Sequence, residues 1–358
     1  MIKILTRYIA KTITLAVGLT ALIITAVLFL IAMLAELKNI GQGDYTLLQA
    51  FWYVLLRMPN QLYQFFPLLI LLGSIVGLSA LSVNREIAVM RVYGFSVKQI
   101  IYSVLGAALT LIILATIVGE LAAPHLSYRA EIQKENAQNG GQAVVTASGV
   151  WFHVDNNFIH VQNVVGRELL KGVTRYEFTD DHRLVAAYYA KELAYQNNEW
   201  RMYDIVKTTF YPEQTKSQSI AQAPWNLPFN TNLLNIGLVD PSEMSLAKLA
   251  KFSDYLEQNG LQAAEYQYQF WQRIFQPLAS LIMLFIAIII VLGTVSNSSL
   301  GLRVVTGILV GFAFFILNAF LGQISIVYQL PAFLAALLPL ILFAVLSLIY
   351  YRYRLRRT

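Results

Sequence analysis

Cysteine is absent from the sequence and charged residues are scarce, and these two shortages already exclude several classes of protein. Without cysteine, neither disulfide bonds nor thiolate metal sites can stabilise the chain. Asp, Glu, Lys and Arg make up 13% of the 358 residues, whereas hydrophobic residues make up 57%, a balance outside the range of ordinary soluble globular proteins. The composition therefore indicates a membrane protein.

Five stretches contain no Asp, Glu, Lys or Arg at all. A bilayer core requires about 20 apolar residues per helix, and four stretches are long enough for one helix each: 13–35, 58–84, 99–119 and 274–302. The fifth stretch, 304–351, has 48 residues and room for two helices, with Gly322 and Pro331 marking the expected turn. The sequence therefore predicts six transmembrane helices, three on either side of a large polar insert.

The excess of Lys and Arg lies in the membrane part of the chain. The net charge is +6, yet residues 121–273 contain 13 Lys and Arg against 16 Asp and Glu, which argues against a nucleic-acid partner. The two termini and the loops after the second and fourth helices hold 11 Lys and Arg, whereas the other short loops hold only Lys38 and Arg57. The positive-inside rule therefore places both termini in the cytoplasm and the insert on the other side.

The insert changes from helical to alternating periodicity, which is typical of an all-β domain. We expect a hairpin around residues 155–157 and strands separated by polar turns: 150–154, 158–161, 173–178, 184–190, 191–195 and 200–210. After Pro228 the pattern is helical again, with Asp240 as the N-cap of a helix that leads back to the membrane. The expected domains are a membrane half at 1–123, a β domain with a helical connector at 124–265, and a second membrane half at 266–358.

No motif for catalysis or nucleotide binding occurs in the sequence. A phosphate-binding loop and a Gly-x-Ser-x-Gly motif are both absent, so the chain does not bind ATP through such a loop. All four histidines lie in the insert: His125, His153, His160 and His182. Because no cysteine or acidic cluster accompanies them, we interpret them as surface or strand residues. We expect no catalytic residue, no metal and no cofactor bound by this chain.

The loop between the second and third helices has the pattern of a short amphipathic helix at residues 84–94. Ile87 and Met90 fall on one face, and Gly94 ends the helix. On the cytoplasmic side, such a helix is typical of docking into a groove of a soluble partner, whereas a solvated charged loop is the alternative. The candidate docking residues are Glu86, Ile87, Met90, Arg91 and Gly94.

A few polar residues lie at or inside the predicted helices. Lys38 follows the outer end of the first helix, where its ammonium group can reach an anionic headgroup or the aqueous interface. Arg303 begins the fifth helix on the inner side, where the positive-inside rule accounts for it. We expect Glu120, Asn318 and Gln323 to form hydrogen bonds between helices.

Several segments occur in the order and spacing of a known family. They are GQGDY at 41–45, Glu86, MRVYGFS at 90–96, IFQPL at 274–278 and RVVTG at 303–307. Together with three helices on each side of a β insert, they resemble the YjgP/YjgQ permeases over essentially the whole chain. These permeases are inner-membrane subunits of the lipopolysaccharide exporter of Gram-negative bacteria, an ABC transporter.

The resemblance implies partners and a substrate. The chain most resembles the branch of the family that pairs with the related subunit LptF, and each of the two docks a loop helix on one copy of the ATPase LptB, which holds ATP and Mg²⁺. The insert would be a jellyroll-like periplasmic domain that joins a bridge with LptC and LptA. The substrate would be lipopolysaccharide, taken from the outer leaflet of the inner membrane.

The same resemblance implies roles for individual residues. Glu86 and its helix would carry the motion of the ATPase into the membrane. The implied lipopolysaccharide contacts are Lys38 for a phosphate, Phe65 and Phe66 for acyl chains, and the basic residue Arg303. Asn39 and Asn60 stand where relatives can carry lysine, so the ring of cations at the outer mouth would be thinner here.

Three other functions are consistent with the sequence. The chain could be LptF itself, a membrane protein that relays ATPase motion to a periplasmic enzyme without moving lipid, or a scaffold that anchors an envelope complex through its β domain. Copurified lipopolysaccharide would distinguish transport from the last two functions.

Overall fold

The computed structural model describes residues 2–138, 144–154, 156–165, 169–179, 181, 183–196, 199–211, 214–225, 240–258, 262–292 and 299–355. Six helices among these residues are long and apolar enough to cross a membrane, as predicted: Ile4–Asn39, Phe66–Val83, Val97–Gln138, Ala264–Leu292, Leu300–Tyr328 and Ala332–Arg352. The chain is a multi-pass membrane protein whose β domain is inserted between the third and fourth spans.

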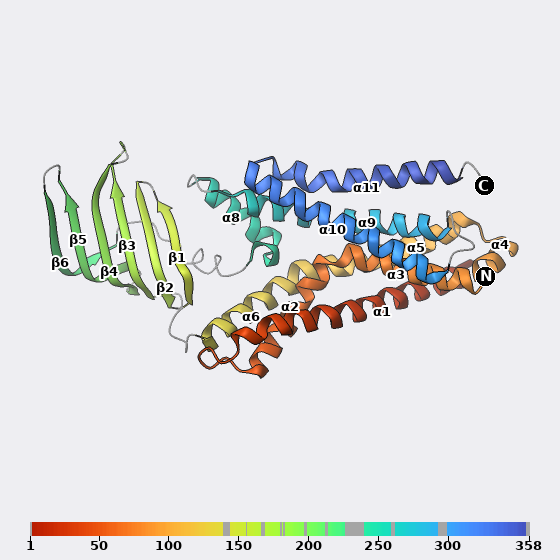
Figure 1. Ribbon diagram of the computed structural model, residues 1–358, viewed down its shortest axis with the longest axis horizontal. Helices are drawn as coiled ribbons and strands as arrows, with labels where there is room; N and C mark the ends of the chain where they lie inside the picture. Colours follow the sequence, from red (N-terminus) through yellow and green to blue (C-terminus); the bar gives the residue numbers. More distant parts are fainter. Residues whose placement is uncertain are drawn as a thin grey trace.

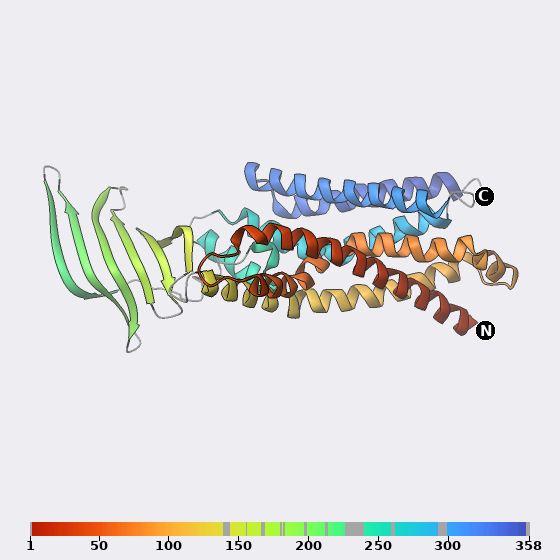
Figure 2. The ribbon, with the colours of Figure 1, turned by 60° about the horizontal axis from the view of Figure 1, so that its bottom comes forward.

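The helices lie side by side in one bundle, and the sheet lies beyond one end of it (Figure 1). The helices before the sheet are α1 (Ile2–Glu36), η1 (Leu37–Asn39), α2 (Leu47–Gln64), α3 (Phe66–Val83), α4 (Glu86–Val92), α5 (Val97–Ile117), η2 (Val118–Ala122) and α6 (Ala123–Gln138). Those after it are η3 (Pro241–Glu243), α8 (Leu246–Gln258), α9 (Ala264–Leu292), α10 (Leu300–Tyr328) and α11 (Ala332–Leu355). Both termini and α4 lie at the end opposite the sheet (Figures 1 and 2).

The centre of the bundle is formed by α3 and α9. Apolar residues surround α3 on all sides, which is the pattern of a buried helix, and α3 packs against α1, α9 and α10. In contrast, α1 and α10 leave most of their apolar side chains exposed. The outer faces of these two helices are therefore available for contact with lipid or with another protein.

The turn inside the fifth uncharged stretch lies at Pro331, one of its two predicted markers. Gln329 ends α10 in a left-handed conformation with φ of 53°, and Pro331 follows it. Gly322, expected at this turn, lies inside α10, where an added Cβ atom would come within 2.6 Å of the Tyr268 ring of α9. The small size of Gly322 therefore serves helix packing and not the turn.

The inserted domain is confirmed as all-β and forms one antiparallel sheet in the order β1–β2–β3–β4–β5–β6. Its strands are β1 (Val144–Val154), β2 (Asn157–Val165), β3 (Leu169–Phe178), β4 (Leu184–Gln196), β5 (Glu199–Phe210) and β6 (Thr215–Pro224). The pairing of Val154 with Asn157 confirms the predicted hairpin. This order is a meander, so the described strands do not have the crossed connections of a Greek-key jellyroll.

Two predictions for the insert were wrong in detail. The segments 184–190 and 191–195 form a single strand, because β4 pairs with β3 and β5 on both sides of Lys191. The polar strand β6 was not predicted, since its sequence lacks apolar alternation, but it pairs with β5 along its length.

The connector after the sheet also begins differently from the prediction. Asp240 caps the short turn η3, where its side chain accepts a hydrogen bond from the backbone N–H of Ser242 over 2.8 Å. The helix α8 begins later, at Leu246. Asp240 is therefore the cap of η3 and not of the connector helix.

Candidate functional site

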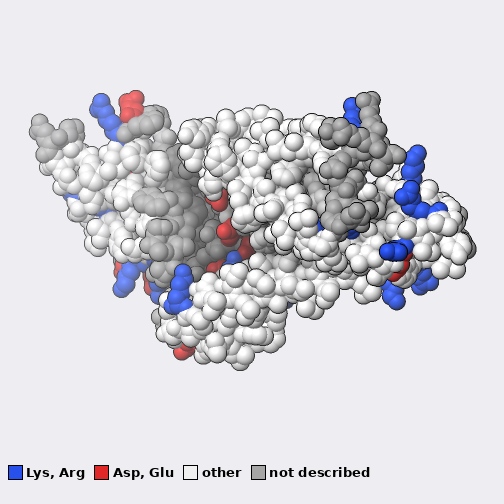
Figure 3. Space-filling model, turned by 45° about the vertical axis from the view of Figure 1, so that its right-hand side comes forward, with Lys and Arg blue, Asp and Glu red and all other residues white. Residues whose placement is uncertain are grey.

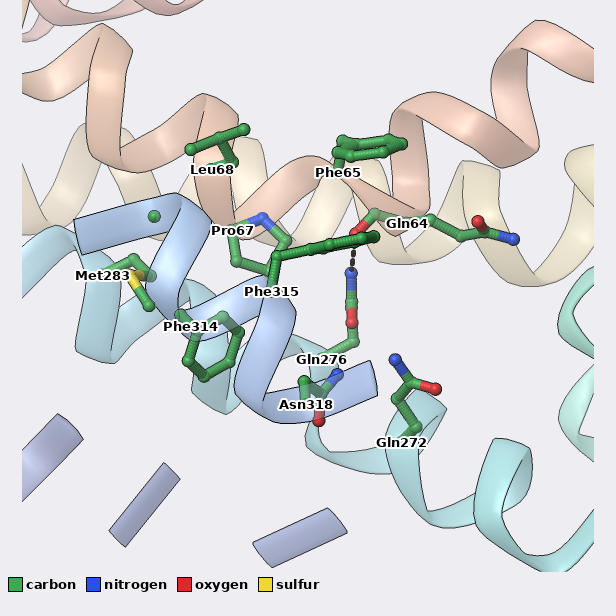
Figure 4. Close-up of a pocket in the computed structure, with 11 residues that line it drawn as sticks. Gln64, Phe65, Pro67, Leu68, Gln272, Gln276, Met283, Phe314, Phe315 and Asn318 are labelled. Atoms are coloured by element: carbon green, nitrogen blue, oxygen red, sulfur yellow. Dashed lines mark hydrogen bonds between the residues drawn. The ribbon is translucent and has the colours of Figure 1, made fainter. Parts of the chain in front are cut away.

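The second uncharged stretch is interrupted at Phe65, between α2 and α3. Pro67 lacks a backbone N–H, so the carbonyl of Tyr63, four residues earlier, cannot accept the usual helical hydrogen bond from residue 67. Gln276 on α9 compensates, because its Nε2 donates to the carbonyl oxygens of Tyr63 and Gln64 over 2.8 and 3.0 Å. Freed backbone groups inside a membrane require such partners. The hydrogen bonds from Gln276 at this helix break therefore hold α9 against the α2–α3 junction (Figure 4).

A groove lies beside this junction, between α2–α3 and α9–α10. It consists of two adjoining hollows of about 110 and 30 Å³ that share several lining residues. The rings of Phe65 and Phe315 stack at its edge, with centroids 5.0 Å apart and planes inclined by 14° (Figure 4). The remaining walls carry carboxamides from Gln64, Gln269, Gln272, Gln276 and Asn318. We call this feature the amide groove.

A buried cation, Arg273 of α9, lies at the back of the amide groove. Arg273 is 7% exposed, and its guanidinium donates to Glu120 Oε1 over 3.2 Å and to Asn60 Oδ1 over 2.9 Å. Glu120 belongs to the π-helical turn η2, a type of irregularity that is frequent at functional sites. The bond between helices that was predicted for Glu120 is confirmed, and its partner is a buried charge.

Asn318 also forms the predicted contact between helices. The hydroxyl of Tyr268 on α9 donates to the carbonyl oxygen of Asn318 over 2.7 Å and lies 3.2 Å from its Oδ1. This contact joins α9 to α10 at Asn318, which lines the amide groove. The groove is thus bordered by helices that are hydrogen-bonded to one another.

The connector from the sheet is attached to the same part of the bundle. Glu120 Oε2 accepts a hydrogen bond from the backbone N–H of Leu246, at the start of α8, over 3.1 Å. Arg57 on α2 forms a salt bridge with Glu243 of η3. Burial would lower the pKa of Arg57, but the hydrogen bond and charge of Glu243 raise it above its usual range, so the guanidinium stays charged. The return path from the sheet is therefore fixed to α2 and η2.

Sequence reasoning placed Arg273 at the membrane interface as an anchor, and it assigned no partner to Arg57, Glu243 or Arg273. Arg57 and Glu243 are 186 positions apart, and nothing in the spacing of a single sequence indicates that two such residues meet. The available signal was the position of charged residues next to long uncharged stretches, where an unpaired charge would be costly. That signal identifies candidates, but it does not identify their partners.

Comparison with known proteins agrees with this architecture. The family described as "Lipopolysaccharide export system permease LptF/LptG" matches residues 7–353. The chain belongs to this family. A relative from Escherichia coli (strain K12) is 32% identical over 348 residues, which cover 96% of this chain and 97% of the relative. A relative from Haemophilus influenzae is 29% identical and covers 97% of both chains, and both relatives are named lipopolysaccharide export system permease protein LptG.

The lipid contacts implied by resemblance to the LptF/LptG family do not form one cluster. Phe65 lines the amide groove, whereas Phe66 packs against the hydrophobic core. Lys38 is exposed in η1, just beyond α1. Arg303 is 2% exposed in the first turn of α10, near the α4 end of the bundle, and its Nη1 lies 3.5 Å from Ser79 Oγ. Only Phe65 of these four residues lines the groove.

The two asparagines expected to stand where relatives can carry lysine make contacts within the chain. Asn39 Nδ2 donates to Glu36 Oε1 over 2.9 Å, and Glu36 also pairs with Lys134 at 2.7 Å. Asn60 is fully buried and accepts from Arg273. Both positions therefore stabilise the sheet end of the bundle.

The predicted loop helix exists as α4, but its apolar face is turned inward. Met90 is 6% exposed and belongs to the bundle core, and Ile87 packs against the same core. The outward face instead exposes Val92 and Tyr93, by 85% and 71%. Ile87 and Met90 therefore anchor the helix, and the exposed apolar surface lies at its C-terminal end.

The remaining candidates lie at both ends of α4, with Glu86 at its start and Arg91 and Gly94 near the exposed end. Glu86 is half-buried, accepts from Asn84 Nδ2 over 3.5 Å, and lies beside the Tyr8 hydroxyl of α1. Arg91 is exposed. Gly94 has φ of 85°, a left-handed conformation that favours glycine and ends the helix.

Among the residues that the structure describes, no three His, Asp or Glu side chains are grouped so as to hold a metal ion. His125 Nδ1 lies 2.9 Å from the Leu121 carbonyl oxygen, within its own helix. The side chain of His153 and all of His182 lie outside the described residues.

Proposed function

We propose that this chain is a transmembrane subunit of an ABC transporter that extracts lipopolysaccharide from the outer leaflet of the inner membrane and passes it to a periplasmic bridge. The observation that carries the proposal is the amide groove, which lies among membrane helices and beside the connector to the sheet. Its stacked rings suit acyl chains, and its carboxamides suit polar groups at their roots. Membership in a family described as lipopolysaccharide export permeases supports this substrate.

The energy for transport would come from a partner ATPase, LptB, which would bind ATP and Mg²⁺ as a homodimer. The contact surface would be α4, where Val92 and Tyr93 expose apolar surface at the bundle end opposite the sheet. Glu86 and Arg91 would form polar contacts at its rim. Met90 would transmit the motion, because its side chain is packed in the core that contains α3.

A second six-helix subunit, LptF, would cover part of the exposed membrane surface. The helices α1 and α10 have the smallest buried share among the six described spans. Their outer faces are apolar along the bundle, which suits either lipid or a partner helix. The relatives named LptG support assignment to that branch of the family and not to LptF.

The bundle would lie in the inner membrane with α4 and both termini in the cytoplasm. Figure 3 shows a broad surface without charged side chains along the bundle and Lys and Arg side chains gathered at the end away from the sheet. The positive-inside rule supports this orientation. The sheet would then project into the periplasm.

The sheet would continue the lipid path through a bridge with LptC and LptA. Among the described strands, β1 and β6 each have one paired neighbour, so each presents a free edge. Free edges can accept a strand from another protein by main-chain hydrogen bonding. We therefore propose that partner domains attach at these edges.

The proposal is tested by photo-crosslinking in the complex that copurifies with this chain. A crosslinker at Phe65 should capture lipopolysaccharide, whereas one at the neighbouring Phe66 should not, because Phe66 packs against the core. Glu86→Lys should leave ATP hydrolysis but abolish lipopolysaccharide release. An active copurified ATPase without any lipid captured at Phe65 would instead support the relay or scaffold function.

A further inference from the structure

The amide groove contains carboxamides that the fold itself does not use. On α9, Gln269, Gln272 and Gln276 are spaced so that all three fall on one helix face. The side chain of Gln276 already donates hydrogen bonds to the carbonyl oxygens of Tyr63 and Gln64. In the part of the chain that the structure describes, the side chains of Gln269 and Gln272 form no hydrogen bond, although both line the groove. Their polar groups are therefore available to a ligand.

The other walls add further unused polar atoms. Gln64 donates through Nε2 to the Ser242 carbonyl over 3.2 Å, which leaves its Oε1 as an acceptor. Asn318 accepts through Oδ1 from Tyr268, which leaves its Nδ2 as a donor. Figure 4 shows the amides of Gln272, Gln276 and Asn318 grouped below the stacked rings. The groove thus offers donors and acceptors together.

The depth of these groups can be derived from the length of α9. A helix of 29 residues is roughly 43 Å long, close to the full thickness of a bilayer with its headgroups. Gln272 is about 12 Å from the first residue of α9 at the sheet end and directly precedes Arg273 and the uncharged stretch 274–302, so it lies near the boundary between headgroups and hydrocarbon. This is the level at which acyl chains join a headgroup. At this depth an unpaired carboxamide is costly, so a polar ligand group is favoured there.

We infer that the amide groove distinguishes lipids by the chemistry at the root of their acyl chains, with Gln272 as the main specificity residue. The inference rests on the proposed transport function and names the feature of the substrate that the groove recognises, the linkage at the root of its acyl chains. A glycerophospholipid has only ester groups at this level, and esters accept hydrogen bonds but cannot donate them. Lipid A carries amide-linked and hydroxylated acyl chains, which do both.

The carboxamide oxygens that have no donor within the protein allow the groove to discriminate between lipid A and phospholipids. A phospholipid in the groove would satisfy the amide N–H groups but leave the oxygens of Gln64 and Gln272 without a donor. A site that hydrogen-bonds its substrate rejects analogues that lack the matching group, because its own polar atoms are then left unpaired. The hollow of about 110 Å³ has room for such a small polar group.

The test is a competition between hexa-acylated lipid A and cardiolipin for the full chain with its copurifying partners in nanodiscs. Cardiolipin is the matched competitor, because it also carries two phosphates and several acyl chains, but all its chains are ester-linked. We expect Gln272→Leu to lower the preference for lipid A about tenfold, through weaker lipid A binding. Cardiolipin binding should change much less, because the loss of the amide N–H donor is offset by removal of the unpaired amide oxygen. Gln269→Leu is the second variant, in case Gln272→Leu does not fold.

The matched control is Gln267→Leu, which makes the same change on α9 but lines a different hollow. It should leave the preference unchanged. An unaltered preference in Gln272→Leu or Gln269→Leu, an equal loss of both lipids, or the same drop in Gln267→Leu would overturn the inference. Failure of the unsubstituted protein to retain lipid A at all would overturn the proposed function and the inference together.

Discussion

Arg273 and Glu120 form a buried ion pair, 3.2 Å apart, between two helices that cross the membrane. The second carboxylate oxygen of Glu120 accepts from Leu246 at the start of α8. One carboxylate thus joins the third span, the fourth span and the connector from the sheet. A shift of η2 relative to α9 would therefore break this ion pair unless the connector and η2 moved together.

Removal of either partner of this pair is expected to destabilise the bundle strongly. Arg273→Leu leaves the Glu120 carboxylate without its cation, and Glu120→Leu leaves the guanidinium without its anion. Breaking a buried pair in this way typically costs about 3–5 kcal/mol. The loss is measured as the free energy of unfolding in an SDS titration followed by circular dichroism.

The double variant Arg273→Met with Glu120→Leu separates charge from packing. Because it leaves no unpaired charge, it should recover most of the stability that each single variant loses. Arg91→Leu, at an exposed position, is the control and should change stability by no more than about 0.5 kcal/mol. A double variant as unstable as the single variants would show that packing, and not charge pairing, determines the effect.

Gln276 and Gln272 provide a second contrast, one helical turn apart. Gln276→Leu removes the donor for the Tyr63 and Gln64 carbonyls, and each unsatisfied buried group costs about 1–3 kcal/mol. Gln272→Leu should leave the free energy of unfolding unchanged, because Gln272 makes no hydrogen bond within the described chain. Equal losses in the same SDS titration would contradict the assignment of structural and ligand-facing roles to these two residues.

The spans could be predicted from the sequence because the absence of charge over about 20 residues is a physical requirement of the bilayer core. The hairpin at 155–157 was equally visible, because alternation around a polar turn is a local pattern. The strand β6 was missed because its order comes from pairing with β5 and not from apolar alternation. Of the two residues expected to mark the turn in the fifth uncharged stretch, Pro331 lies at it and Gly322 does not, because glycine serves both turns and close helix packing.

The candidate site was less predictable than the spans. The position of α4 was recognisable from its periodicity, but its orientation depends on which neighbour buries Ile87 and Met90. The amide groove depends on contacts between α2, α3, α9 and α10, which are distant in the sequence. Local spacing indicated that Gln269, Gln272 and Gln276 share a face, but it could not indicate that Gln276 compensates for the break before Pro67.

Gly73 on α3 is expected to set the distance between α1 and α3. A Cβ atom at this position would lie 2.6 Å from the Val17 Cα, and a backbone atom cannot move aside as a side chain can. Gly73→Ala should therefore displace α1 and destabilise the bundle by about 1–3 kcal/mol. Because the chain has no cysteine, spin labels on single introduced cysteines in α1 and α3 report the displacement directly.

Gly106 on α5 is the matched control for this substitution. An added Cβ atom there has no neighbour within 4 Å among the described residues, so Gly106→Ala should leave the distance between labels and the stability unchanged. If Gly73→Ala leaves the label distance as short as in the parent protein, the close approach of α1 and α3 does not depend on this glycine.

The two faces of α4 should respond differently to substitution. Val92→Asp places a charge on the most exposed apolar residue of the proposed ATPase contact, so it should reduce the amount of ATPase that copurifies with the chain by about tenfold or more. The free energy of unfolding should stay within about 0.5 kcal/mol of the parent value, because Val92 is 85% exposed. Copurification is measured by quantitative mass spectrometry of the detergent-solubilised complex.

Met90→Ala is the complementary variant, because Met90 lies in the bundle core. It should lower the free energy of unfolding by about 2–5 kcal/mol, as expected for truncation of a buried side chain. Its effect on the copurified ATPase should be smaller than that of Val92→Asp when equal amounts of folded protein are compared. If Met90→Ala instead releases the ATPase while the chain remains stable, Met90 faces the partner, and α4 must be turned by about half a rotation in the complex.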